Sequence, residues 1–329
     1  MKASVIVVTW NGRELLRKNL PAVLAQSQPD YEVVVVDNGS ADGSVELLDR
    51  EFPGVRVVRL PENRGFAGGN NAALPFCRGE YLVRLNNDAR PEPDWLGRLV
   101  AAADANPRVG VVASKLVEEG GLLDSAGDRY LTSWAADKRG VHEPPASFDR
   151  ADGIFGACGG AALYRRRLVD EIGFFEEDFF LIYEDVDLSF RARLMGWEVV
   201  YVPGAVVHHA VGASVDRVPD LKLYYQYRNS EYVWIRNVPG RLLWKHAPVA
   251  VLQRLVEVWE AWRLRGRFRI YLRAKRDVLL NLPRLLAQRR RLQRSRRAGP
   301  DQIERAMSPV RLMDGAHWRE EIRKVLRWG

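Results

Sequence analysis

Short apolar runs alternate with amphipathic stretches up to about Gly110. The runs are rich in Val and Ile and lack strict apolar–polar alternation, and they cover residues 3–9, 32–37, 55–60, 81–88 and 109–114. Strands of this kind are covered on both faces, as in a parallel sheet flanked by helices. The stretches between them fit helices at residues 14–26, 44–51, 67–77 and 95–105. The pattern therefore predicts an α/β domain with a mostly parallel central sheet, of the nucleotide-binding type.

The pattern changes twice further along the chain. Residues 116–150 are irregular, which predicts loops and short strands bordering a site. Residues 151–215 are dense in motifs, and amphipathic helical stretches follow from about Val218. The second change predicts a helical, Arg-rich C-terminal extension.

Composition allows a sizeable core and argues against a secreted or membrane-spanning protein. Of the 329 residues, 47% are hydrophobic, and Cys77 and Cys158 are too far apart to suggest a disulfide or metal site. The first apolar run is too short for a signal peptide, and no run approaches the roughly 20 apolar residues of a spanning helix. We therefore expect a cytoplasmic protein, which could still lie on a membrane.

Positive charge is concentrated near the C-terminus. The net charge is +8, but residues 263–297 contain fourteen Arg or Lys and one acid, a local +13 that leaves −5 for the rest. Such a segment could be a solvated basic face, a nucleic-acid surface or an amphipathic helix on anionic lipid. Because no nucleic-acid-binding module is visible, we expect an anionic membrane surface as partner and no nucleic acid.

Polar side chains follow two of the predicted strands. Asp37 ends the second strand, and Asn86, Asn87 and Asp88 end the fourth, just before Pro91 and Pro93. Ligands bind at this carboxyl edge in open α/β sheets. Asp37 could accept a hydrogen bond from a ribose hydroxyl or a base, or it could simply close the turn. A carboxylate such as Asp88, together with a substrate diphosphate, can hold Mg²⁺ or Mn²⁺.

A glycine-rich segment, "NRGFAGGNNAA", follows the third predicted strand. Gly68 allows close backbone approach, Arg64 offers a phosphate-pairing cation and Asn70 offers an amide. The segment is neither G-x-G-x-x-G nor a P-loop, which argues against dinucleotide oxidoreductases and P-loop nucleotidases.

Two acids, Glu184 and Asp185, begin the segment "YEDVDLSFRARLMGW". Val186, Phe190 and Leu194 recur at helical spacing, so the acids belong to the first turn of a helix. The helix dipole favours ionised carboxylates there, which suits a general base. The alternative is ordinary decoration of a helix start.

Adjacent histidines close a later strand in "VVHHAVGAS". Neighbouring strand residues face opposite ways, so at most one of His208 and His209 can point into a site. That imidazole could join Asp88 as a ligand of Mn²⁺.

Taken in order, "VIVVTWNG", "VVVVDNGSADGS", "NRGFAGGNN", "LNNDARPEPDWL", "GACGGAALYRR", "YEDVDLSFRARLMGW" and "VVHHAVGAS" resemble the inverting glycosyltransferases of family 2. The resemblance extends from about residue 3 to 230, including "YYQYRNS", and is strongest to bacterial rhamnosyltransferase-like members. It implies a GT-A fold with a catalytic domain over 1–217. Residues 1–115 would form its nucleotide-binding half and 116–217 its acceptor half, with the helical extension over 218–329.

The resemblance also implies site residues. Asp185 matches the catalytic base, with Glu184 beside it at the acceptor. Asp88 matches the last position of the metal-binding triplet, although Asn86 stands where many relatives have Asp. The pattern H-x-x-G-x-S selects His209 as the metal or diphosphate contact, with His208 as the alternative. The implied nucleotide-binding residues are Thr9, Asn11, Asp37, Asn38, Arg64, Gly68, Asn70, Asn86 and Asn87.

The implied function is transfer of a sugar, with rhamnose as a candidate, from a nucleoside-diphosphate sugar to a glycan or polyprenyl-linked acceptor in cell-envelope polysaccharide synthesis. A divalent cation, Mg²⁺ or Mn²⁺, would assist one inverting displacement. The enzyme would work peripherally on the inner face of the cell membrane, and self-association into a homo-oligomer stays open. A non-catalytic nucleotide- or glycan-binding relative docked to a membrane or partner is the main alternative. A nucleotidyltransferase is disfavoured because "TWNGRELL" lacks its Gly-rich loop.

Overall fold

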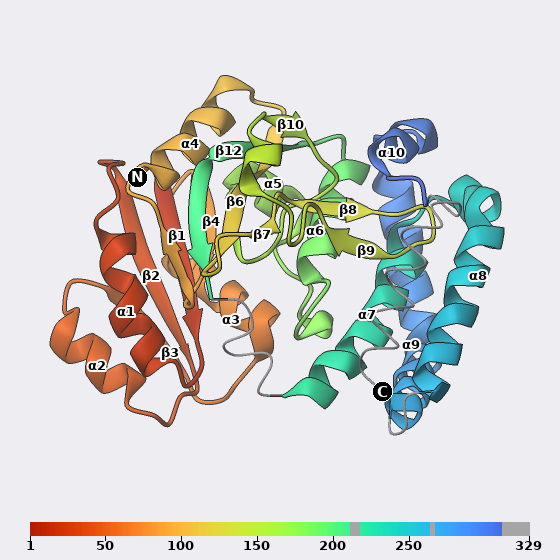
Figure 1. Cartoon of the computed structure of the whole chain (residues 1–329), viewed down its shortest axis with the longest axis horizontal. Helices are drawn as coiled ribbons and strands as arrows, with labels where there is room; N and C mark the ends of the chain where they lie inside the picture. Colours follow the sequence, from red (N-terminus) through yellow and green to blue (C-terminus); the bar gives the residue numbers. More distant parts are fainter. Residues whose placement is uncertain (211–217, 264–266, 311–329) are drawn as a thin grey trace.

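One large mixed sheet forms the body of the protein, and helices from the C-terminal part pack beside it (Figure 1). The computed structural model describes residues 1–210, 218–263 and 267–310. The large sheet contains β1 (Ala3–Thr9), β2 (Tyr31–Asn38), β3 (Arg56–Leu60), β4 (Tyr81–Asn86), β5 (Ala89–Pro91), β6 (Val109–Glu118), β7 (Leu123–Ser125), β10 (Asp152–Gly153), β11 (Ala161–Arg165) and β12 (Glu198–His209). A separate pair is formed by β8 (Asp128–Tyr130) and β9 (Ala136–Lys138).

Strand order brings the chemically interesting strand ends together. The sheet runs β10-β12-β6-β11-β4-β1-β2-β3, with β5 paired to β12 and β7 to β6. The four neighbouring strands β4, β1, β2 and β3 are mutually parallel, and β6 is parallel to β12. The expected mostly parallel sheet is confirmed for this frame, but β11 lies antiparallel between β4 and β6. The carboxyl ends of β1, β2 and β4 therefore share one edge.

Helices cover both faces of the sheet. One face is covered by α1 (Arg13–Leu24), α2 (Ser44–Glu51) and α4 (Trp95–Ala105), and the other by α3 (Gly65–Ala73), α5 (Arg166–Ile172) and α6 (Glu184–Leu194). Alternate residues of β1 serve the two cores, Val5 toward α1 and Ile6 toward α3. The predicted helix over 67–77 ends at Ala73 and continues only as a 3₁₀ turn, because Pro75 cannot donate the next helical hydrogen bond.

The C-terminal helices form a third core together with β8 and α6. They are α7 (Pro219–Asn237), α8 (Gly240–Arg263), α9 (Arg267–Ser295) and α10 (Pro300–Ala306). This core joins Tyr130 and Phe190 to Tyr232 and Val278, so it contains residues from both sides of the predicted boundary at 217. Within the described residues, no helix has the length and apolar character needed to cross a membrane.

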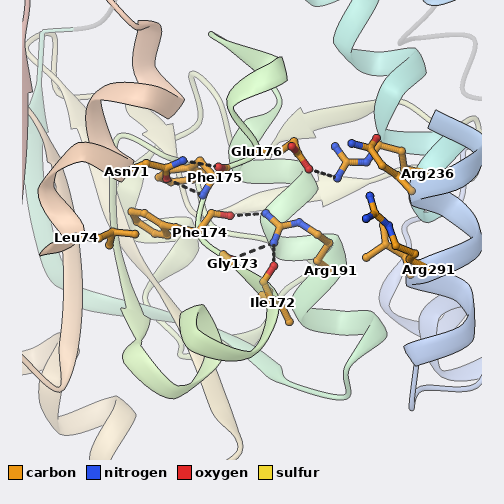
Figure 2. A pocket seen from close by; sticks show the side chains of 12 residues that line it. Asn71, Leu74, Ile172, Gly173, Phe174, Phe175, Glu176, Arg191, Arg236 and Arg291 are labelled. Atoms are coloured by element: carbon orange, nitrogen blue, oxygen red, sulfur yellow. Dashed lines mark hydrogen bonds and ion pairs between the residues drawn. The ribbon is translucent and has the colours of Figure 1, made fainter. Parts of the chain in front are cut away.

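An arginine of α7 fastens this helix to the sheet domain (Figure 2). Arg236 of α7 donates to Glu176 at 2.8 Å. Nearby, Arg191 of α6 pairs with Asp187 at 2.7 Å and donates to the carbonyl oxygens of residues 172–174. A cavity of about 460 Å³ is lined by both arginines and by residues of α3 and α9. The Arg236–Glu176 pair therefore holds α7 against the turn that precedes α6.

Candidate functional site

A cavity of about 480 Å³ opens at the carboxyl edge of the sheet, where ligands bind in α/β folds. Of the predicted site residues, it is lined by Asn38, Asn86, Asn87, Asp88 and His209. The predicted residues that are not part of this lining are Thr9, Asn11, Asp37, Arg64, Gly68, Asn70, Glu184 and Asp185. Aromatic walls come from Phe66 and Phe180.

Asp88 and His209 meet inside this cavity. His209 Nε2 lies 3.2 Å from Asp88 Oδ1, and its Nδ1 lies 2.9 Å from Asp124 Oδ2. Asp124 is in turn paired with Lys138 at 2.6 Å. All three members of the Asp88–His209–Asp124 chain are buried. The neighbouring His208 instead contacts Glu92 at 2.6 Å, so the strand alternation places His209 in the site.

The electrostatics of this chain set the state of the imidazole. Burial by itself would lower the pKa of His209, but the hydrogen bond with Asp124 and the adjacent carboxylate of Asp88 raise it to about 9. Asp124 can only accept, so Nδ1 carries a proton and Nε2 is the position that gains or loses one. Asn86 also lies 2.9 Å from Nε2. The orientation of that amide follows the protonation of Nε2.

The donor set fits a hard divalent cation. Neighbouring ligands of an octahedral cation, each about 2.1 Å from the metal, lie about 3.0 Å apart. The 3.2 Å between Asp88 Oδ1 and His209 Nε2 is close to this separation, and Asp88 Oδ1 has no hydrogen-bond partner in the protein. A carboxylate such as Asp124 on the far nitrogen is the usual support of a ligating histidine. Among the residues that the structure describes, no cluster of three or more His, Cys, Asp or Glu is arranged to hold a metal, so a diphosphate and water would supply the remaining ligands.

The ends of β1 and β2 are held together by loop contacts. Thr9 pairs with Asp37 in register and accepts from the Asn87 amide at 3.0 Å. The backbone N–H of Asn11 donates to Ser40, and its side-chain oxygen accepts from the N–H of Ala41. Asp37 is buried and its Oδ1 lacks a hydrogen-bond partner. That oxygen is available to a ligand donor at the predicted nucleotide edge.

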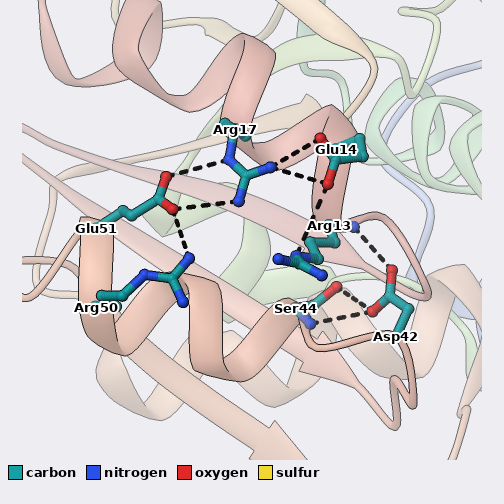
Figure 3. Close-up of polar contacts among 7 residues, drawn as sticks. All are labelled: Arg13, Glu14, Arg17, Asp42, Ser44, Arg50 and Glu51. Carbon is teal, nitrogen blue, oxygen red and sulfur yellow. Dashed lines mark hydrogen bonds and ion pairs between the residues drawn. The ribbon is translucent and has the colours of Figure 1, made fainter.

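The Asp42 side chain also joins these two loops (Figure 3). Its carboxylate accepts from the backbone N–H of Arg13 at 2.9 Å and from that of Ser44 at 3.1 Å. These are the first residues of α1 and α2, so one side chain satisfies exposed donors of two helices.

The glycine-rich segment leads into α3 and forms most of that helix, and its Asn63, Gly65 and Phe66 line the cavity. Asn38 donates to Asn63 and to the Gly65 carbonyl, each at 3.0 Å, and accepts from the Arg64 N–H. Arg64 pairs with the exposed Glu177 at 2.8 Å. Gly68 packs against the Arg64 side chain, and Asn70 donates to its own helix at Phe66. Asn38 therefore both holds this segment and lines the cavity.

Gly65 has φ +70°, and a Cβ there would lie 2.4 Å from the Phe180 carbonyl oxygen. This close approach brings the start of α3 against residues 180–182, which line the cavity. A side chain at residue 65 would push the two walls apart.

Glu184 and Asp185 begin α6 as predicted, and Asp128 lies buried near them. Burial and the adjacent charge of Asp185 raise the pKa of both Glu184 and Asp128. Burial raises the pKa of Asp185 too, but it accepts N–H groups from Gly159 at 2.7 Å and Val186 at 2.8 Å, which oppose the rise. Asp185 is therefore the member of this acid cluster best supported as a carboxylate.

The expectation that the helix dipole would decide these ionisation states needs correction. The acids do lie in the first turn, but burial is the largest influence and moves the pKa of Glu184 and Asp185 upward. Glu184 Oε2 also has no hydrogen-bond partner. Desolvation in a closed interior outweighs the dipole, which acts most on exposed charge.

Arg84 of β4 connects the acid cluster to the cavity. It is buried, lines the cavity and lies 4.1 Å from the centre of the Phe66 ring. Burial lowers the pKa of Arg84 to about 10, opposed by the charges of Asp88 and Glu184 among others. A Cβ at Gly159 would lie 3.2 Å from the Phe66 ring and 3.0 Å from Asp185 Oδ2. Asp185 and Phe66 therefore both lie against Gly159.

Sequence reasoning missed Arg84, Asp124, Lys138 and the contacts of α7. An arginine inside the apolar run "YLVRLNND" was a usable signal, because an unpaired charge in a buried strand is costly. Asp124 and Lys138 lie in the irregular segment and carry no spacing signal.

The loop before α6 is strained and is held by α7. Phe180, Ile182 and Tyr183 have φ values of 60°, 67° and 73°. The amide of the fully buried Asn229 donates to the carbonyl oxygens of Phe179, Leu181 and Ile182 at 2.9, 2.8 and 2.7 Å. Arg228 donates to the carbonyls of Asp178 and Phe179. These bonds offset a backbone cost of about 1–3 kcal/mol for each left-handed residue.

Comparison with known proteins places this chain in a family. The model of glycosyl transferase family 2 matches residues 4–173. The N-acetylglucosaminyl-diphospho-decaprenol L-rhamnosyltransferase of Mycobacterium tuberculosis is 25% identical over 294 residues, 80% of this chain and 89% of that enzyme. Protein y4gI of Sinorhizobium fredii is 30% identical over 230 residues, 64% of this chain, and the O-antigen biosynthesis protein RfbC of Myxococcus xanthus is 28% identical over 239 residues, 69% of this chain. The match spans only 24% and 19% of the lengths of these two relatives.

Solved structures agree on the fold. Residues 1–349 of TarS from S. aureus superpose with a TM-score of 0.59 at 19% identity, covering 93% of this chain and 89% of TarS. A mannosyltransferase of Pyrobaculum calidifontis, solved with GDP-Man and Mn²⁺, gives 0.54 at 20% identity, covering 93% and 85%. The family match spans just over half of the chain, and the sheet topology agrees with it: the chain belongs to glycosyl transferase family 2 and has the GT-A fold.

Proposed function

We propose that this protein transfers a sugar from a nucleoside-diphosphate sugar to an acceptor hydroxyl by a single inverting displacement. The observation that carries the proposal is the arrangement around Arg84. Asp88 and His209 line the same cavity as Arg84 and Phe66, and Asp185 and the Phe66 ring both lie against Gly159. A site for the leaving group with a base close to it is what such a displacement requires.

The nucleoside would bind at the ends of β1 and β2. Asp37 Oδ1 would accept a hydrogen bond from the nucleoside there, and the loop that contains Asn11 would help to shape the site. The diphosphate would extend toward Asp88 and His209, where a bound Mg²⁺ or Mn²⁺ would offset the charge on the departing diphosphate. The buried guanidinium of Arg84 adds a fixed positive charge in the same cavity.

Asp185 is proposed to take the proton of the attacking acceptor hydroxyl. Two backbone N–H groups hold this carboxylate in one orientation, while Glu184 beside it is favoured in its neutral form. A carboxylate with a raised pKa is the stronger base. A neutral Glu184 can donate a hydrogen bond to the acceptor.

We propose a lipid-linked or glycan acceptor in cell-envelope polysaccharide synthesis, with rhamnose as the first sugar to test. The support is the likeness to the mycobacterial rhamnosyltransferase, named for a decaprenol-linked acceptor. Peripheral attachment to the inner face of the cell membrane would place the enzyme beside such an acceptor, and the basic C-terminal segment suits an anionic lipid surface.

Asp185→Asn should lower the turnover number by about 10²- to 10⁴-fold, because the amide cannot accept the proton. Affinity for the nucleoside diphosphate, measured by calorimetry, should stay near that of the parent because Asp185 does not line the cavity. Asp137→Asn, on the exposed partner of Arg129, is the matched control and should keep its turnover. Parental turnover in Asp185→Asn would remove this residue from the mechanism.

The pH profile of kcat/KM should have an acid limb above the ordinary aspartate range of about 3.9. Burial raises the pKa of Asp185, so the ionised base forms only at a higher pH, and activity is lost as pH falls through that raised pKa. Initial rates at fixed ionic strength and saturating metal would locate the limb. A rate that stays constant down to the ordinary aspartate range would contradict the assignment.

Asp88→Ala should abolish most Mn²⁺ binding in the presence of a nucleoside diphosphate, and Asp124→Asn should weaken it by about 10- to 100-fold through the supporting bond to His209. Electron paramagnetic resonance titration of free Mn²⁺ measures both. His208→Gln is the control, because that neighbour contacts Glu92 and should bind Mn²⁺ like the parent. Equal affinity in all variants would exclude this metal site.

Asn229→Ala should release the loop over residues 180–183. Three backbone carbonyls lose a donor, so stability should fall by about 2–3 kcal/mol and the turnover number should fall with it. Limited proteolysis should cut the variant at this loop while the parent resists. Asn281→Ala removes an amide bonded within its own helix and serves as control. A stable variant with an intact loop and normal turnover would argue against this positioning role.

A further inference from the structure

Helix α8 buries Leu242 and Ala250 in the third core, but it carries several of its largest apolar side chains on the outside of the protein. Trp244, Leu255 and Trp262 are 85%, 61% and 67% exposed, and Val251 and Trp259 are exposed as well. We call these five residues the tryptophan stripe. They recur at spacings of seven, four, four and three residues, so they share one helical face.

The inner face of α8 is correspondingly charged. Arg254 pairs with Glu231 of α7 at 2.8 Å and with Glu257 at 2.9 Å. Lys275 of α9 joins the same Glu231 at 2.5 Å. Ionic contacts of α8 with α7 thus fix its rotation, and the helix cannot turn its apolar side inward without leaving those charges unpaired.

The stripe is long and continuous. From Trp244 to Trp262 an α-helix rises about 27 Å. Scattered surface hydrophobics are ordinary, but a contiguous apolar face of this length marks an interaction surface. Figure 1 places α8 at the outer side of the C-terminal helices, away from the sheet.

We propose that the tryptophan stripe inserts into the interfacial layer of an anionic membrane, with α8 lying in the membrane plane. Tryptophan favours this layer because its ring is apolar and its N–H stays hydrated. The described helices do not meet the requirements of a membrane span, which leaves an in-plane position for α8. The inference deepens the proposed action on a lipid-linked acceptor and rests on it only for its biological purpose.

Charge favours a lipid over a second copy of the chain. Helix α9 packs against α8, and the segment 263–297 that contains it has a net charge of +13. Two copies joined stripe to stripe would bring these positive segments together, which is repulsive. An anionic lipid surface is attracted to the same charge.

The test is flotation of the full chain with vesicles of phosphatidylcholine alone and with vesicles containing one third phosphatidylglycerol. The triple variant Trp244→Ser, Trp259→Ser, Trp262→Ser should lose binding by about tenfold or more for each tryptophan removed, on both vesicle types. The triple variant Arg269→Gln, Arg290→Gln, Arg294→Gln on α9 should lose binding only to the anionic vesicles. The fluorescence of the parent should shift to the blue on binding.

Controls separate this inference from the proposed activity. Leu24→Ser, Phe76→Ser, Leu122→Ser changes three exposed apolar residues of the sheet domain and should float like the parent. Transfer to a short-chain, water-soluble acceptor should be equal in the tryptophan variant and the parent, so a failed enzyme and a failed membrane surface give different results. Unchanged flotation of the tryptophan variant would overturn the inference. So would a parent that is dimeric in ultracentrifugation, ignores vesicles and becomes monomeric in the tryptophan variant.

Discussion

The structure depends on keeping ionised groups paired inside a protein interior at the carboxyl edge of the sheet. An isolated buried charge is expensive, so each one must find a partner. Asp124 bridges His209 and Lys138, and His209 reaches Asp88. At the start of α6, backbone N–H groups support Asp185. These pairings leave Asp88 Oδ1 and Asp37 Oδ1 without hydrogen-bond partners in the protein, at the positions where a ligand would supply them.

The C-terminal helices are part of the structure that forms the site. Asn229 of α7 supplies the donors that a left-handed loop needs, and that loop forms a cavity wall and leads into α6. Arg236 fixes the same helix through Glu176. The contacts that attach the extension therefore also position the proposed catalytic residues. A displacement of α7 would be transmitted to the acids of α6 through the three hydrogen bonds of Asn229.

The polarity of α8 follows from the same rule of paired charges. Glu231 pairs with both Arg254 and Lys275 between the helices, which holds α8 with the tryptophan stripe on its outer side. A helix with a second apolar face of this kind needs an apolar environment on that side. A basic neighbour, α9, makes an anionic lipid layer the environment that suits both surfaces.

The sequence determined the frame of the fold and most of the chemistry at the strand ends. Val-rich runs and turn residues predicted the strands β1 to β4 and the helices α2 and α4, because burial on both faces leaves a continuous apolar signal. The motif order also indicated Asp88, Asp185 and His209 as candidates. Only the tertiary structure placed β11 between β4 and β6, selected His209 over His208 at the cavity and brought Asp124 and Asn229 to their partners. Those contacts join residues 47 to 85 positions apart, and no local pattern encodes a pairing at that separation. Burial likewise raised the pKa values of the α6 acids, which depends on what surrounds a side chain and not on its neighbours in sequence.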